Sequence, residues 1–149
     1  MKKYLETVRN HCPLVHNITN YVTVNDVANI ILACGASPIM ADEPEGSAGN
    51  HNHLSGLNIN IGTLHKSSIE SMFLAGKKAN ELGHPVLLDP VGAGASTLRT
   101  QTAVKLMQEV RFSVIRGNMS EIKVLSGGMG GARGVDACGD GYCYGRDFR

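Results

Sequence analysis

The hydrophobic and polar residues of this chain follow two repeat lengths. Some segments carry an apolar residue every three to four positions, as a helix does when it buries one face, and short apolar runs separate them. The predicted helices are 2–11, 22–34, 67–82, 102–110 and 119–125. The predicted strands are 38–40, 57–61, 86–88 and 112–115. Because strands alternate with helices, we expect an α/β fold with a mainly parallel sheet, flanked by helices and joined by right-handed crossovers.

One predicted strand ends in an acidic residue that a glycine-rich turn follows. Asp89 closes an apolar run, and Gly92 and Gly94 precede a helix that should open at residues 96–97. A carboxylate at the carboxyl end of a parallel strand lies where open α/β sheets bind ligands. Glycines there let the backbone approach an anion near a helix N-terminus. The alternative is an ordinary strand-to-helix turn in which Asp89 caps the helix.

A second strand-to-helix junction carries further polar side chains. Arg116 follows a predicted strand, and Asn118 and Glu121 lie three positions apart at the start of the next helix, so their side chains share a face. Such oxygen ligands suit a hydrated Mg²⁺ beside phosphates, and the Arg116 guanidinium suits phosphate or a nucleotide. The alternative is an N-cap at Asn118 and a solvated Glu121. Because both junctions should share one sheet edge, we favour a phosphate and metal site.

Composition and charge exclude several classes of function. The chain has 149 residues, with 14 Lys and Arg against 13 Asp and Glu, and a net charge of +1. Scattered basic residues and the absence of Trp argue against a nucleic-acid or membrane partner. No apolar run reaches the roughly 18 residues of a membrane span, and no signal-peptide core is present, so we expect a cytoplasmic protein. The four cysteines form no C-x-x-C pair and are expected to be free thiols.

Six short segments of the chain form a series with a characteristic order and spacing. They are Pro13-Leu-Val-His-Asn-Ile-Thr-Asn20, Gly35-Ala-Ser-Pro-Ile-Met40, Asn60-Ile-Gly-Thr63, Leu88-Asp-Pro-Val-Gly-Ala-Gly-Ala95, Ile115-Arg-Gly-Asn118 and Gly134-Val-Asp136. Through this series, residues 4–137 resemble the bacterial hydroxyethylthiazole kinase family. The resemblance implies a ribokinase-like fold and a kinase of thiamine biosynthesis or salvage. Such an enzyme phosphorylates 4-methyl-5-(2-hydroxyethyl)thiazole with ATP and Mg²⁺.

The resemblance also implies roles for residues at the two junctions. It assigns Asp89, Glu121 and Asn118 to Mg²⁺ and the phosphate groups, and Arg116 to the nucleotide. The family's Gly-Thr-Gly-Cys segment, with its Cys beside the substrate hydroxyl, does not occur in this chain, so no catalytic residue is assigned. Two alternatives stay open. One is a non-catalytic remnant that binds a small ligand or intact subunits, and the other is a ribokinase-like kinase for a different small molecule.

On the substrate side, the resemblance places Met40 beside the thiazole and Asn20 near the same pocket, in a loop over 16–20. From residue type alone, Met40 would be assigned to core packing. His16 in that loop is expected to be a hydrogen-bonded structural residue rather than a proton shuttle. The resemblance further implies a homotrimer in which the Asn20 and Met40 region meets the metal edge of a neighbouring subunit.

Two segments interrupt the pattern. Between Pro44 and Leu57 a parallel sheet needs a crossover, normally a helix, but the residues there are rich in Gly and Asn. His51 and His53 could suggest a metal site, although this spacing in such a tract is more typical of a solvated loop. With one permissible choice of codons, 46–54 and 138–149 read in another frame give patterns of the family kind, so we expect frame-shifted segments. The alternative is a genuine short variant with a divergent tail. We therefore divide the chain into residues 1–137, the N-terminal part of a kinase domain truncated at its C-terminus, and an aberrant tail, 138–149.

Overall fold

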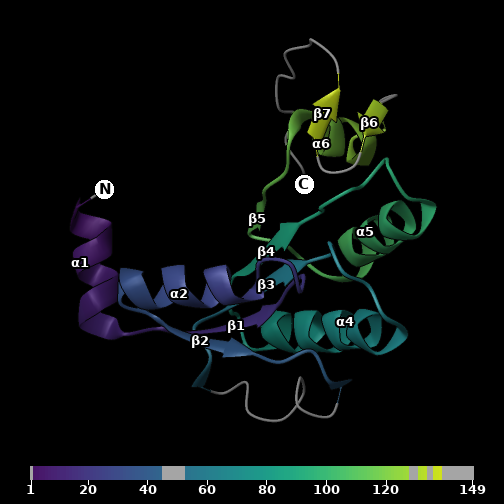
Figure 1. Ribbon diagram of the computed structural model, residues 1–149. Coiled ribbons are helices and arrows are strands. Elements are labelled where there is room, and N and C mark those ends of the chain that lie inside the picture. The colour runs from purple at the N-terminus through teal and green to yellow at the C-terminus, as the bar shows by residue number, and fades with distance from the viewer. Residues whose placement is uncertain (1, 45–52, 128–130, 134–135, 139–149) are drawn as a thin grey trace.

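Five parallel strands form the central sheet of the computed structural model, which describes residues 2–44, 53–127, 131–133 and 136–138 (Figure 1). Their order across the sheet is β2-β1-β3-β4-β5. The strands are β1 (Leu14–Ile18), β2 (Ser37–Met40), β3 (Gly56–Asn60), β4 (Val86–Asp89) and β5 (Val114–Ile115). The parallel α/β fold expected from the sequence is confirmed.

Helices connect the strands and cover part of the sheet. They are α1 (Lys2–His11), α2 (Val24–Cys34), α4 (Lys66–Glu81), α5 (Thr97–Glu109) and α6 (Met119–Leu125). Helix α4 packs on β1, β3 and β4, and α5 packs on α4 and α6. The buried core comprises Ile18, Leu57, Ile59, Ile61, Met72, Ala75, Ala79, Val86, Leu88, Ala103, Leu106 and Val110. The core thus lies between the middle of the sheet and the apolar faces of α4 and α5.

The strand register brings the ends of three strands to one edge of the sheet. Asn60, the last residue of β3, pairs with Asp89, the last residue of β4. Leu88 pairs with Ile115 at the end of β5. Parallel strands present all their carboxyl ends at the same edge, so the polar residues that follow β3, β4 and β5 become neighbours.

The structure corrects the sequence prediction at the first strand. Residues 16–20 are expected to form a loop near the substrate, but Leu14–Ile18 is β1, which lies inside the sheet. The strand shows no apolar-polar alternation, since His16 and Asn17 are consecutive polar residues and both are buried. Nε2 of His16 lies 2.7 Å from the carbonyl oxygen of Ala41, and Nδ2 of Asn17 donates to the carbonyl of Val15. A buried polar pair with bonded groups is tolerated in a sheet interior.

Two predicted boundaries near the site also differ. Helix α5 begins at Thr97, before the predicted range 102–110. The prediction began too late because residues 97–101 are mostly polar and show no apolar period. Its N-cap is Ser96, where the glycine-rich turn predicts the opening of a helix. Strand β5 is shorter than the predicted range 112–115.

The segments expected to be frame-shifted fall mostly outside the described residues. Of 46–54, the structure describes only His53, which is exposed, and Leu54, which is buried. Of 138–149 it describes only the backbone of Cys138. This residue ends β7 (Asp136–Cys138), which pairs antiparallel with β6 (Gly131–Arg133); neither strand is predicted by the sequence pattern.

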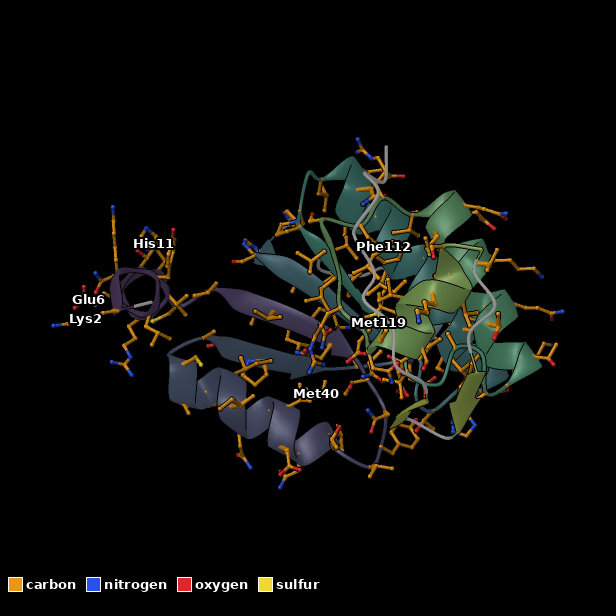
Figure 2. All side chains as sticks on the ribbon, turned by 90° about the horizontal axis from the view of Figure 1, so that it is seen from above. Lys2, Glu6, His11, Met40, Phe112 and Met119 are labelled. Atoms are coloured by element: carbon orange, nitrogen blue, oxygen red, sulfur yellow. The ribbon has the colours of Figure 1, made fainter. Side chains whose placement is uncertain are left out.

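The N-terminal helices bury little surface. Helix α1 stands away from the sheet in Figure 1, and its side chains, among them Lys2, Glu6 and His11, project on several sides in Figure 2. Helix α2 is largely apolar but has no buried residue, and Ile30 and Leu32 are more than half exposed. Among the described residues, no helix is both long and apolar enough to cross a membrane.

Candidate functional site

A cavity of about 320 Å³ lies at the carboxyl ends of β4 and β5. Its lining comprises Asp89 and Val91 after β4, and Arg116, Gly117, Asn118 and Glu121 after β5. The structure thus brings together the four residues that the two junctions predict as phosphate or metal ligands. They meet because β4 and β5 are parallel neighbours, and both junctions lie on one sheet edge, as the sequence predicts.

The first turn of α6 positions Asn118 and Glu121 through reciprocal hydrogen bonds. The side chain of Asn118 accepts a bond of 3.0 Å from the backbone N–H of Glu121, and Oε2 of Glu121 accepts one of 2.8 Å from the backbone N–H of Asn118. Asn118 is therefore an N-cap, in line with the alternative interpretation. Glu121, however, is only 4% exposed and is not a solvated side chain.

The glycine-rich turn after β4 is used internally. The backbone N–H of Gly92 donates a bond of 2.9 Å to Oε1 of Glu121, and that of Gly94 donates one of 2.8 Å to Oγ1 of Thr100. Both glycines have positive φ, which favours glycine. A Cβ at Gly92 would also lie 2.5 Å from Nη1 of Arg99. The anion that the Gly92 backbone approaches is thus the Glu121 carboxylate of the protein itself.

Asp89 is the half-buried acidic group of the cavity. Its Oδ2 accepts hydrogen bonds from Nδ2 of Asn60 at 3.1 Å and from Nη1 of Arg116 at 2.9 Å. Burial raises the pKa of the Asp89 carboxyl, and the charge of Glu121 raises it further, while Arg116 and the Asn60 hydrogen bond oppose the rise. The side chain of Arg116 is 75% exposed, so water screens this ion pair.

The donor set of the cavity suits Mg²⁺ better than a transition metal. It contains two carboxylates, and the described residues hold no cluster of three or more His, Cys, Asp or Glu that could enclose an ion. Both oxygens of Glu121 accept backbone hydrogen bonds, whereas the hydrogen bonds that Asp89 accepts from the described residues fall on Oδ2 alone. Mg²⁺ keeps several waters and uses one or two carboxylates plus substrate phosphates. The residues present therefore fit a hydrated Mg²⁺ near Asp89.

Of the two residues expected on the substrate side, only Met40 lines a cavity in the described part of the structure. Met40 lines a small cavity of about 50 Å³ together with Asn17, Thr19, Tyr21, Val24, Ala41 and Asp42. Asn20 does not belong to that lining. Its Nδ2 donates instead to Oδ1 of Asn60, on the side toward Asp89.

His16 is a structural residue, as the sequence analysis expects. It is 2% exposed, and its Nε2 bonds the carbonyl oxygen of Ala41. Burial lowers the pKa of the imidazole, while the bond to Ala41 opposes this shift. A buried, neutral imidazole has little access to solvent or ligand and is poorly placed to transfer protons.

Sequence reasoning missed the residues that support the site. Asn60 bonds Asp89, Arg99 donates a bond of 2.8 Å to the carbonyl of Gly62, and the Tyr21 hydroxyl bonds Asp42 beside Met40. The alternation of Asn58 and Asn60 within an apolar strand was the available signal. Two amide side chains on one face of a buried strand need hydrogen-bond partners. This need could have predicted a bond to a polar residue at the end of the neighbouring strand.

A family model described as the hydroxyethylthiazole kinase family matches residues 5–142 of the chain. The hydroxyethylthiazole kinase of Clostridium acetobutylicum is 65% identical over 137 residues, which are 92% of this chain and 50% of that protein. That of Clostridium beijerinckii is 62% identical over 133 residues, 89% of this chain and 48% of that protein.

A solved structure shows the same likeness in three dimensions. The hydroxyethylthiazole kinase of Pyrococcus horikoshii OT3 matches with a TM-score of 0.81 at 45% identity, over 85% of this chain and 51% of that one. The chain spans about half the length of the curated relatives it matches. Because the family model covers nearly all of it, the chain belongs to the hydroxyethylthiazole kinase family.

Proposed function

We propose that this chain is the N-terminal part of an ATP-dependent kinase for 4-methyl-5-(2-hydroxyethyl)thiazole, acting in thiamine biosynthesis or salvage. The observation that carries the proposal is the convergence of Asp89, Arg116, Asn118 and Glu121 on one cavity at the carboxyl edge of a ribokinase-like sheet. Family membership supports the identity of the substrate. A cytoplasmic location is part of the proposal, because the reaction needs a supply of ATP.

The chemistry proposed for the site is positioning and charge stabilisation rather than covalent catalysis. Mg²⁺, when bound, neutralises charge on the phosphates. Asp89 would hold it, since this carboxylate faces the cavity and Arg116 can leave it for a phosphate. Buried Glu121 adds a second negative charge and keeps the Gly92 turn and the Asn118 cap in fixed positions. Arg116, exposed and forked, would grip the nucleotide phosphates.

The substrate side and the assembly belong to the same proposal. Met40 would border the thiazole ring, because it lines the small cavity beside Tyr21 and Asp42. The exposed apolar residues of α2, with Ile39 on the neighbouring edge strand β2, would contact other copies in a homotrimer. Apolar faces of this kind commonly mark protein interfaces.

A rival proposal is a nucleotide-binding remnant without turnover. It differs from the first proposal only in turnover, and the chain spans about half the length of the curated relatives it matches. Assay of phosphate transfer from Mg-ATP to the thiazole alcohol separates the two, with the chain alone and with a polypeptide carrying the other half of a relative. Turnover by the chain alone would refute the remnant. Turnover in neither case, despite Mg-ATP binding, would support it, and preference for another alcohol would indicate a different kinase.

A further inference from the structure

Asn60 lies at the end of β3, directly beside the carboxylate of the candidate site. Its Nδ2 donates a hydrogen bond of 3.1 Å to Oδ2 of Asp89, its partner in the strand register. Asn60 is 8% exposed and does not belong to the lining of the cavity at the ends of β4 and β5. It can therefore act on a ligand there only through Asp89.

The other end of the Asn60 amide fixes its orientation. Oδ1 accepts a bond of 2.9 Å from the backbone N–H of Gly62 and one of 3.1 Å from Nδ2 of Asn20. A backbone N–H can only donate, so the atom that faces Gly62 must be the oxygen. The amino group of Asn60 must then face Asp89, and the carboxylate receives a donor.

Asn20 extends this series of bonds to the start of α2. Its Oδ1 accepts from the backbone N–H of Thr23 at 3.0 Å and from the Thr23 hydroxyl at 3.1 Å. Each donor in the series from Thr23 through Asn20 and Asn60 points toward Asp89, where the series ends on a carboxylate. Hydrogen bonds aligned in this way polarise one another and are strongest when the last acceptor is charged.

Gly62 makes the close approach of the two amides possible. A Cβ at this position would lie 2.9 Å from Cβ of Asn20 and 3.0 Å from Oδ1 of Asn60. The Gly62 carbonyl is held in turn by Arg99 of α5. The turn after β3 is thus built around the contact between Asn20 and Asn60.

We propose that Asn60 is a positioning residue that holds the Asp89 carboxylate in place for a Mg²⁺-bound nucleotide and links it to Asn20 on the substrate side. This inference rests on the proposed function, which assigns Asp89 to Mg²⁺. It adds a residue that touches neither ligand, and it makes the position of the Asn20 turn and that of the metal edge depend on one another.

The first test titrates ADP by calorimetry, with and without Mg²⁺, into residues 1–149 fused to the second half of a relative. Asn60→Leu keeps the approximate volume of the amide but removes its donor and acceptor. We expect the Mg²⁺-dependent gain in ADP affinity to fall roughly tenfold or more, as for loss of a hydrogen bond to a charged group, while the affinity without Mg²⁺ changes little. Gly62→Ala, which crowds the amides without removing them, should give a smaller loss of the same kind.

Asn58→Leu is the matched control. Asn58 lies on the same face of β3, but its Nδ2 donates to Oδ1 of Asn17 rather than to Asp89. Circular dichroism should show all the variants folded, and Asn58→Leu should bind Mg-ADP within about twofold of the unaltered chain. Equal losses with and without Mg²⁺, or equal losses in the Asn58 and Asn60 variants, would overturn the proposal.

Hydrogen exchange separates failure of this inference from failure of the proposed function. If the unaltered protein does not bind Mg-ADP, the proposed nucleotide site is wrong. The series of hydrogen bonds from Thr23 to Asp89 is then judged from the backbone amide of Thr23, which donates to Asn20. In Asn60→Leu this amide should exchange several-fold faster than in Asn58→Leu. Equal exchange in the two variants would overturn the proposed link between Asn60 and Asn20, whether or not a nucleotide binds.

Discussion

The charge of Asp89 favours binding of a cation but costs free energy of folding, because the carboxylate is partly buried. Its carboxylate faces the cavity, and burial raises its pKa. We expect Asp89→Asn to weaken Mg-ADP binding by more than roughly tenfold, since the amide loses the charge that attracts the ion. Calorimetric titration checks this, with Glu109→Asn on the exposed side of α5 as a control. Retention of full Mg²⁺-dependent affinity in Asp89→Asn would remove Asp89 from the metal site.

The same substitution should alter the pH dependence of stability. The folded pKa of Asp89 lies above its unfolded value, so ionisation of this group costs folding free energy. That cost is absent below the ordinary Asp pKa of about 3.9 and is fully present above the folded pKa. Asp89→Asn should therefore melt at a higher temperature than the unaltered chain at neutral pH, and the difference should vanish as the pH falls toward 4. A variant that is less stable at neutral pH would contradict this assignment.

His16 should make the fold sensitive to acid. Its folded pKa is lowered by burial, so the unfolded chain binds the proton first as the pH falls below about 6.5. Stability that is present above that value is then lost. His16→Gln has no group that titrates there, so its melting temperature should change less than that of the unaltered chain between about pH 7.5 and about pH 5.5. Parallel melting curves of both proteins over this range would show that His16 is not the sensitive group.

At the scale of elements, Glu121 joins the turn after β4 to the start of α6. It accepts the backbone N–H groups of Gly92 and Asn118, one on each oxygen. Glu121→Gln replaces one acceptor with an amino group, so one buried N–H loses its partner. We expect a loss of about 1–3 kcal/mol in the free energy of unfolding, measured by urea denaturation.

Glu109→Gln is the control for this loss. Glu109 pairs with Lys77 on the surface, where both side chains are nearly half exposed. Its substitution should cost less than about 1 kcal/mol. Similar losses in the two variants would mean that the Glu121 carboxylate does not hold the two elements together.

Elements with a clear apolar period could be predicted from the sequence. Helices α1 and α6 match their predicted ranges, and β2, β3 and β4 differ by single residues at their ends. Strand β1 could not be found in this way, because its buried pair His16 and Asn17 is satisfied by distant backbone groups. The first turn of α5 was not predicted either, because residues 97–101 are mostly polar and show no apolar period.

The candidate site was predictable at the level of its residue types. Asp89, Arg116, Asn118 and Glu121 follow adjacent parallel strands, and adjacency on the sheet brings them together. Their hydrogen bonds were not predictable. Nothing in the sequence indicates that the amide of Gly92 is bonded to Glu121, because such contacts depend on how two loops meet in space.

At the scale of the whole molecule, the exposed apolar surface on α2 should govern behaviour in solution. Ile30 is 61% exposed and Leu32 is 56% exposed, and β2 and β5 are edge strands of the described sheet. Exposed apolar faces and open edges favour association. Because the chain spans about half of its relatives, we expect it alone to be poorly soluble or partly unfolded rather than a discrete trimer. The binding and melting experiments therefore use residues 1–149 fused to the second half of a relative.

Size-exclusion chromatography combined with thermal melting tests this expectation. Ile30→Lys should increase the soluble fraction, whereas Val104→Lys, at a 38% exposed position on α5, should not. Fusion with the second half of a relative should restore a cooperative melt. A sharp, cooperative trimer formed by residues 1–149 alone would contradict the prediction.

The central claim is that this chain carries a Mg²⁺-nucleotide site at the carboxyl edge of β4 and β5. The most direct measurement is a ¹H–¹⁵N NMR titration with Mg-ADP of residues 1–149 fused to the second half of a relative. We predict saturable shifts at the backbone amides of Gly92, Gly117 and Glu121, which lie in or beside the cavity, and little change in α1. The absence of saturable shifts, or shifts confined to residues away from that edge, would contradict the account.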